Sequence, residues 1–301
     1  MLGDLALDVV LAPARDLATG TDVPGRVHLR QGGSAATTAR WLAILGARST
    51  LVTSVGRDVV GRALVAEVAR VGVVIRGRRV ARARTARIGV LVAPDGERSF
   101  VADRGAADLL RPADLREAWF RDIDVLHLPA YSLLGEPLGS TGRHAVELGR
   151  SSGAAVSVDL ASVGPLLAGG VAGARRVIGA VGPDILFATE AEIGALLERR
   201  SLVVAASLAP VVFVKRGSHG TTVVTRSSAG RTERFDVATT PVRAADTTGA
   251  GDAFDAGALT VWATAAPDER SRPAVLRRAA VAGQRAAVRQ LTRPRPEVAL
   301  G

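Results

Sequence analysis

The stretch DTTGAGDAFDAGAL, residues 246–259, places three small residues directly before an aspartate and then continues as an apolar run with helical spacing. The first N–H groups of a helix have no partner inside the helix and carry partial positive charge. Because Gly249, Ala250 and Gly251 have no long side chains, the backbone here can cradle an anion. Asp252 would then be a base that takes a proton from a hydroxyl while a phosphoryl group arrives. The alternative is an ordinary glycine turn in which Asp252 caps the helix.

Length and composition limit the class of protein. With 301 residues, of which 48% are hydrophobic, the chain can form one large α/β domain or two smaller ones, and disorder is excluded. The net charge is +10, but arginines are scattered among acids, and the densest cluster, residues 76–87, contains no aromatic residue. This pattern argues against a nucleic-acid partner. The chain has no cysteine, which excludes disulfides and thiolate zinc sites.

No segment has the pattern of a membrane or secretory sequence. The longest uncharged runs, residues 160–174 and 201–214, are too short to span a bilayer, and no basic segment followed by an apolar run opens the chain. We therefore expect a cytoplasmic protein without a membrane partner.

Strand-like and helix-like stretches alternate along most of the chain. Strands are predicted at 48–56, 123–130, 154–160, 183–189, 210–217 and 221–226, and helices at 59–73, 140–153 and 191–200. Such alternation predicts a mainly parallel sheet with helices on both faces.

One segment interrupts this alternation. Residues 86–105 contain two strand-like arms around Asp95-Gly96, a dipeptide typical of hairpin turns. We predict a small β-strand lid formed by 86–105 together with 12–30, and a homodimer in which two lids cover each other's apolar side. The alternative is a surface ribbon that only covers a sheet edge.

The opening stretch resembles, along its whole length, the second signature of the PfkB, or ribokinase-like, carbohydrate kinase family. GGSAATTARWLAILGA, residues 32–47, resembles the first signature, and the likeness continues through DRGA, VDLAS, ATEAE and VKRGSHG. The resemblance covers nearly the whole chain, 1–301, as a single kinase domain. It implies a three-layer α/β/α sandwich with a mainly parallel central sheet and a small β-strand lid.

The resemblance also assigns roles at the phosphoryl-transfer site. It implies that Asp252 is the catalytic base and that Gly249, Ala250 and Gly251 form the anion hole. The implied nucleotide-binding residues are Thr189, Lys215, Gly217 and Gly220. For the ions, it implies Mg²⁺ held by Glu192 through water, and a monovalent cation, K⁺, near Asp246 and Thr248.

For the acceptor, the resemblance implies that Asp8 accepts hydrogen bonds from hydroxyl groups, and that Gly32 and Gly33 allow the acceptor to approach the backbone. Thr37 and Arg104 complete the implied acceptor site. For Asp8 the alternative is an acid that caps a turn at a strand end, and Arg104 also fits an ordinary surface charge.

The chain departs from the family at positions where relatives commonly carry asparagine; the residues here are Ala6, Thr37, Ala107, Ala161 and Thr189. Alanine offers neither the donor nor the acceptor of an amide, so some polar contacts must be lost or rebuilt. The start, MLGDLALD, is also short, which predicts a trimmed sheet edge or a late start site.

The resemblance therefore implies an ATP-dependent kinase that phosphorylates a hydroxyl of a sugar or sugar-like small molecule. A nucleoside kinase of the same fold is the first alternative. The second is a degenerate, non-catalytic protein that binds a sugar or a nucleotide, which the missing amides favour and the intact Asp252 argues against.

Overall fold

The structure, a computed structural model, describes residues 1–93, 98–198, 201–226, 230–244, 246–293 and 295–300. Its largest sheet has six strands in the order β12-β11-β10-β9-β8-β7. The strands are β7 (Val125–Pro129), β8 (Ala155–Asp159), β9 (Ile185–Thr189), β10 (Val211–Lys215), β11 (Thr221–Arg226) and β12 (Thr232–Val237). The first four are parallel neighbours, and β11 and β12 are antiparallel. The predicted, mainly parallel sheet is confirmed.

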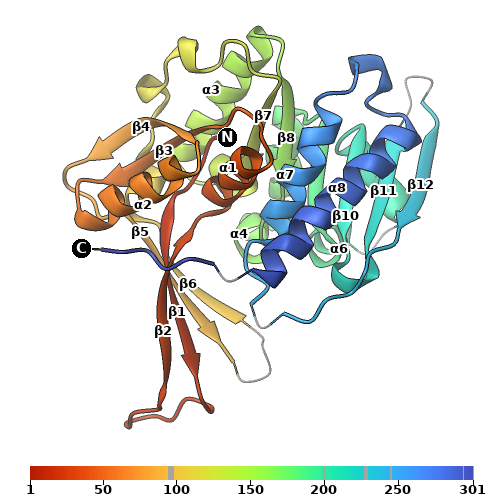
Figure 1. The fold of residues 1–301 in the computed structure, drawn as a ribbon. Helices are drawn as coiled ribbons and strands as arrows, with labels where there is room; N and C mark the ends of the chain where they lie inside the picture. The colour runs from red at the N-terminus through yellow and green to blue at the C-terminus, as the bar shows by residue number, and fades with distance from the viewer. Residues whose placement is uncertain (94–97, 199–200, 227–229, 245, 294, 301) are drawn as a thin grey trace.

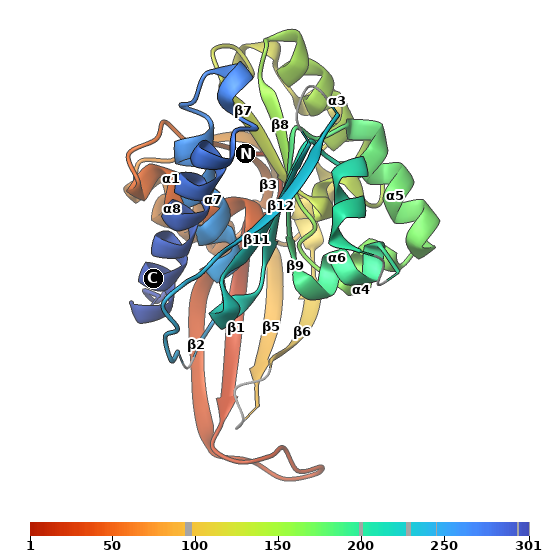
Figure 2. The same cartoon turned by 90° about the vertical axis from the view of Figure 1, so that its right-hand side faces the viewer.

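Helices cover both faces of this sheet, as the turned view shows (Figure 2). One face packs against α3 (Leu138–Ser151), α4 (Val163–Leu167), α5 (Gly170–Val181) and α6 (Glu190–Leu196). On the other face α7 (Ala250–Trp262) and α8 (Pro273–Thr292) pack against the stacked rings of Phe187 and Phe213. The three-layer α/β/α sandwich is therefore confirmed.

A parallel pair, β3 (Thr50–Gly56) and β4 (Val74–Val80), flanks the large sheet and packs with α1 (Ser34–Ile44) and α2 (Val59–Arg70). The first residues join the two sheets, because Leu2 N–H donates to the His127 carbonyl and Gly3 N–H donates to the Val52 carbonyl, both at 3.1 Å. Leu2 and Gly3 thus bridge the two sheets.

A four-stranded sheet, in the order β2-β1-β5-β6, projects from the body (Figure 1). It consists of β1 (Ala6–Pro13), β2 (Gly25–Gly32), β5 (Ala86–Val92) and β6 (Arg98–Asp103). β5 and β6 are antiparallel, as a hairpin requires, while the predicted turn Asp95-Gly96 lies outside the described residues. We call this sheet the β-clasp. None of the helices in the described ranges is long and apolar enough to cross a membrane.

Candidate active site

Predicted site residues gather at the carboxyl ends of the parallel strands. Thr189 ends β9, Lys215 ends β10, and α7 begins beside them. Asp159, to which the sequence analysis gave no role, ends the neighbouring strand β8. In open α/β sheets ligands bind outside these strand ends. The β-clasp joins the body at the same place. β2 ends at Gly32, β1 starts at Ala6 beside it, and Gly33 leads directly into α1.

Asp252 lies in the first turn of α7, behind a turn that only glycine adopts readily. Gly249 has a φ of 77°, in the left-handed region, and a β-carbon there would lie 3.1 Å from the side chains of Thr37 and Gln290. The Asp252 carboxylate accepts a hydrogen bond from the Ser34 hydroxyl at 2.5 Å. Ser34 begins α1 and belongs to the first signature-like stretch, residues 32–47, whereas Asp252 belongs to the second, residues 246–259. The two stretches therefore meet at the predicted base.

The surroundings of Asp252 suit a base that acts near neutral pH. Burial raises the pKa of Asp252 to about 7, and the negative charge of Asp159 adds to that rise, although the Ser34 hydrogen bond opposes it. A general base works best when its pKa is close to the working pH. The carboxyl group can therefore accept a proton from a hydroxyl that is brought against the start of α7.

Lys215 lies directly beneath the small-residue turn. A β-carbon at Gly251 would lie 3.3 Å from the Lys215 ammonium. That ammonium is 3.1 Å from both the Asp159 and the Asp255 carboxylates, in surroundings that are almost fully buried. Burial alone would lower the pKa of Lys215, but the two carboxylates overcome this and raise it. Lys215, predicted to bind nucleotide, is thus a buried, ion-paired cation next to the predicted anion hole.

The predicted acceptor residues converge at the base of the β-clasp. Asp8 is buried on β1, and any β-carbon on Gly32 would collide with its carboxylate. Gly33 has a φ of 91°, and a β-carbon there would lie 2.6 Å from the Asp4 carbonyl oxygen. Both glycines are therefore required for this close approach of strands. Burial raises the pKa of Asp8, and a hydrogen bond from Arg295 opposes that rise.

Arg104 lies against the same region and is not an ordinary surface charge. Its guanidinium is 3.4 Å from Asp4 and 2.7 Å from Asp108, and it lies over the ring of Tyr131 at 5.0 Å from the ring centroid. Thr37 is buried and accepts a hydrogen bond from Gln31 at 3.4 Å.

The predicted nucleotide loop follows β10. Gly217 and Gly220 have φ angles of 56° and 84°, at the two ends of a single 3₁₀ turn. A β-carbon on Gly217 would meet no atom within 4 Å, so the backbone is open on that side.

Thr189 and Glu192, predicted for nucleotide and Mg²⁺, form a capping box at the start of α6. The Thr189 N–H donates to the Glu192 carboxylate at 2.7 Å, and the Glu192 N–H donates to the Thr189 hydroxyl at 3.2 Å. Among the described residues no group of three or more acidic, histidine or cysteine side chains is arranged to hold a metal. The Glu192 carboxylate lies at the start of α6, and its contact with Mg²⁺ through water stays a prediction.

Sequence reasoning missed three functional candidates: Ser34, Asp255 and Arg295. Ser34 and Asp255 lie inside the two signatures but at positions to which no role was given. Arg295 forms ion pairs with Asp8 at 2.9 Å and Asp246 at 3.2 Å. It is 287 residues from Asp8 along the chain, and no local pattern in its segment indicates this contact.

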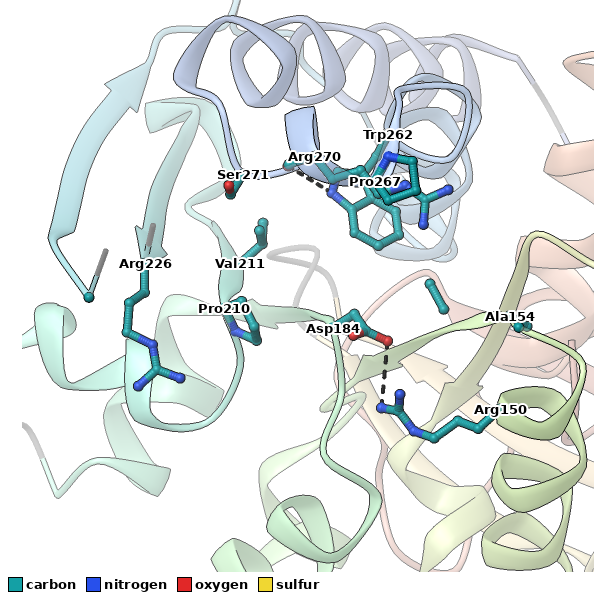
Figure 3. Close-up of a pocket in the computed structure, with 13 residues that line it drawn as sticks. Arg150, Ala154, Asp184, Pro210, Val211, Arg226, Trp262, Pro267, Arg270 and Ser271 are labelled. Atoms are coloured by element: carbon teal, nitrogen blue, oxygen red, sulfur yellow. Dashed lines mark hydrogen bonds and ion pairs between the residues drawn. The ribbon is translucent and has the colours of Figure 1, made fainter. Parts of the chain in front are cut away.

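A cavity of about 850 Å³ lies at the other end of the strands (Figure 3). It is lined by residues at the amino ends of β8 and β10, with Arg150 paired to Asp184 at 3.5 Å on one side. None of the predicted site residues lines it. The carboxyl-end site is therefore the better candidate for chemistry, because the predicted base Asp252 and the glycine turn lie there.

The central sheet, the β-clasp and the Asp252 carboxylate at the start of a helix form the arrangement expected of a small-molecule kinase with the ribokinase-like fold. The family model "pfkB family carbohydrate kinase" matches residues 1–296. The chain therefore belongs to the pfkB family of carbohydrate kinases, and the predicted family and enzyme class are confirmed.

Similar proteins agree with this assignment. An ATP-dependent ribose-1-phosphate kinase from Halopiger xanaduensis is 34% identical over 80% of this chain and 76% of its own. The probable fructokinase-3 of Arabidopsis thaliana is 30% identical over 85% of this chain and 75% of its own. A fructokinase structure with bound ATP, from Xylella fastidiosa, superposes with a TM-score of 0.80 at 25% identity, over 98% and 92% of the two chains.

Proposed function

We propose that the protein transfers the terminal phosphoryl group of ATP to a hydroxyl of a sugar or sugar phosphate. Asp252 takes the proton from the attacking hydroxyl, and the backbone of Gly249, Ala250 and Gly251 stabilises the charge that develops on the phosphoryl group. The observation that carries the proposal is the position of Asp252 in the first turn of α7, directly behind the left-handed Gly249 and hydrogen-bonded to Ser34. We include a cytoplasmic location in the same proposal, because ATP is the phosphoryl donor.

The residues predicted to hold the acceptor favour a sugar over the alternatives. Asp8 and Asp4 offer acceptors for hydroxyl groups, and the relatives' names include both a free sugar and a sugar phosphate as substrates. A phosphate group on the acceptor is compatible with the guanidinium groups beside these carboxylates, because Arg104 lies 3.4 Å from Asp4 and Arg295 lies 2.9 Å from Asp8. A nucleoside acceptor has no comparable support in these contacts.

A ligand screen tests this proposal. We would measure thermal unfolding with fructose, ribose, ribose 1-phosphate and adenosine, each with and without ATP and Mg²⁺, and then follow ADP formation with every compound that stabilises the protein. A ligand at 100 times its dissociation constant stabilises the fold by about 2.7 kcal/mol. ADP formation that depends on a sugar supports the proposal. Stabilisation without turnover by any compound would favour a non-catalytic binder.

We expect activity to require Mg²⁺ and to depend on the charge of Glu192. In Glu192→Gln an amide oxygen can still accept the hydrogen bond from Thr189, so the start of α6 is preserved while the charge is removed. The variant should need a higher Mg²⁺ concentration for half-maximal rate, by about one order of magnitude. The measurement is a Mg²⁺ titration at saturating ATP. Full activity in excess chelator would show that the magnesium assignment is wrong.

We propose that the β-clasp is a lid over the acceptor and also a dimer contact. Val27 and Val101 are 63% and 78% exposed. Strand pairing places both on the face opposite to Asp8, because Val101 pairs with Gly89 and Val27 with Leu11. Closing of the lid would exclude water, so that the phosphoryl group passes to the sugar. Covering this apolar face requires a second copy.

The double variant Val27→Glu/Val101→Glu should therefore be a monomer where the wild type is a dimer. Light scattering after size-exclusion chromatography measures this mass directly. The same substitution at exposed Val203, far from the β-clasp, is the control. A wild type that is monomeric at tens of micromolar would contradict the dimer, and an unchanged dimer in the double variant would place the contact elsewhere.

A further inference from the structure

The C-terminal segment returns across the root of the β-clasp (Figure 1). After α8 the chain pairs with β2: Arg30 forms an antiparallel bridge with Glu297, and the Val298 N–H donates to the Leu29 carbonyl at 2.8 Å. The Val298 side chain is buried in the core beneath β1 and β3. The segment is therefore held by backbone pairing and by an apolar anchor, which fixes the residues before it.

This anchoring places the Arg295 guanidinium inside the candidate site. One nitrogen is 2.9 Å from the Asp8 carboxylate, and two others are 3.2 and 3.3 Å from one oxygen of Asp246. The Arg295 side chain is only 7% exposed. The guanidinium thus links the carboxylate predicted to hold the acceptor with the first residue of the catalytic turn, in a place where charges are little screened by solvent.

Asp246 in turn holds the catalytic turn in shape. Its second oxygen accepts a hydrogen bond from the Thr248 N–H at 2.9 Å, and Gln290 donates to the Thr248 carbonyl at 2.8 Å. Gly249, with its left-handed backbone, follows directly. The position of Asp246 therefore determines where the anion-hole N–H groups point.

The two residues that the resemblance assigns to a monovalent cation already contact cationic side chains. Asp246 faces Arg295 at 3.2 Å and Arg98 at 3.7 Å, and the Thr248 hydroxyl accepts a hydrogen bond from Arg98 at 2.8 Å. A potassium ion bound to these groups would lie beside two guanidinium groups and be repelled by both. The residues present therefore do not fit a metal ion while Arg295 is in place.

We infer that Arg295 is a built-in cation that takes the place of a monovalent metal ion at the catalytic turn and also orients Asp8. It is a positioning residue, since it acts through Asp246 and Asp8. The inference rests on the proposed function for its effect on rate, whereas its effect on ion binding is independent of that function.

Two series of measurements test the inference. In the first, the thermal unfolding of the wild type is compared in KCl and in tetramethylammonium chloride at equal ionic strength. We expect equal midpoints, and no potassium-specific change in rate. A midpoint or a rate that rises selectively with K⁺ would show that a metal ion uses this site and would overturn the inference. The midpoint decides this even if no acceptor is found.

The second series uses Arg295→Ala, Arg295→Lys and, as the matched control, Arg293→Ala on the exposed part of the same segment. A small displacement of the catalytic turn should lower kcat/KM of Arg295→Ala by about 10- to 100-fold. Millimolar guanidinium should restore part of the rate of Arg295→Ala. The rate of Arg295→Lys should lie between the rates of Arg295→Ala and the wild type. Arg293→Ala should match the wild type.

The outcomes of this series separate a positioning role from a structural one. Guanidinium restores a missing charge at one site but does not repair a misfolded chain, so rescue supports the inference. An Arg295→Ala variant with the wild-type rate would overturn it. A variant that loses rate in proportion to its loss of folded protein, without rescue, would assign Arg295 a structural role only.

Discussion

Replacing Asp252 with asparagine should lower turnover by about two to four orders of magnitude while ATP still binds. The amide has nearly the shape of the carboxyl group and can still accept the hydrogen bond from Ser34, but it cannot take a proton from the acceptor. Turnover is measured by ADP formation with the acceptor found in the ligand screen, and ATP binding by calorimetry. Asp268→Asn, in an exposed 3₁₀ turn, is the matched control.

The pH dependence gives this prediction a second, independent readout. The base must be ionised to act, and burial raises the pKa of Asp252 to about 7. kcat/KM should therefore rise about tenfold per pH unit below pH 7 and level off above it. In Ser34→Ala the carboxylate loses a hydrogen bond that favours its charged form, so the rise should shift to higher pH. A normal rate in Asp252→Asn, or an unchanged pH profile, would exclude Asp252 as the base.

Local sequence patterns predicted the parts of the site that are made locally. Gly249 and Asp252 lie in one turn, and the chemistry of that turn depends on backbone angles that a run of small residues permits. Likewise, the buried apolar runs predicted β8, β9 and β10. Each of these features is determined by residues close in sequence.

The parts that were missed depend on distant contacts or on unusual strands. β4 is rich in arginine and largely exposed, so it lacks the apolar alternation by which strands are recognised. Its pairing with β3 makes it a strand. Arg295 reaches Asp8 across 287 residues, and the partners of Lys215 lie 56 and 40 residues away. Only the folded chain brings such charges together.

Three of the five positions that lack the family's asparagine, Ala6, Ala107 and Thr189, have a local explanation in the structure. Ala6 and Ala107 are buried together with Ala86 in a small apolar cluster, so the alanine side chains bury no unpaired polar group. Ala161 has a φ of 64°, a conformation that asparagine tolerates better than alanine. Thr189 uses its hydroxyl in the capping box of α6. The substitutions change polar contacts around the site but leave the catalytic turn and Asp252 intact, which favours an active enzyme over a degenerate binder.

Replacing Lys215 with methionine should cost stability and activity together. The substitution leaves the Asp159 and Asp255 carboxylates buried without their cation, and breaking a buried ion pair from one side costs about 3–5 kcal/mol. It also removes the positive charge beneath the anion hole at Gly251. Unfolding in urea measures the first effect and turnover of the remaining folded protein measures the second. Arg226→Met, an exposed cation on the neighbouring strand, should change neither.

The double variant Lys215→Met/Asp255→Leu separates the two effects. With one carboxylate removed and the volume filled by apolar atoms, much of the lost stability should return, because an apolar replacement of a buried ion pair is often close to neutral. The rate should stay low, because the positive charge of Lys215 is still absent beside the predicted anion hole. Asp252 also loses the cation that lowers its pKa. Recovery of the full rate along with stability would mean that Lys215 only supports the fold. If the free energy of unfolding of Lys215→Met is within about 1 kcal/mol of the wild-type value, the ion pairs of Lys215 with Asp159 and Asp255 do not stabilise the fold, whatever the substitution does to the rate.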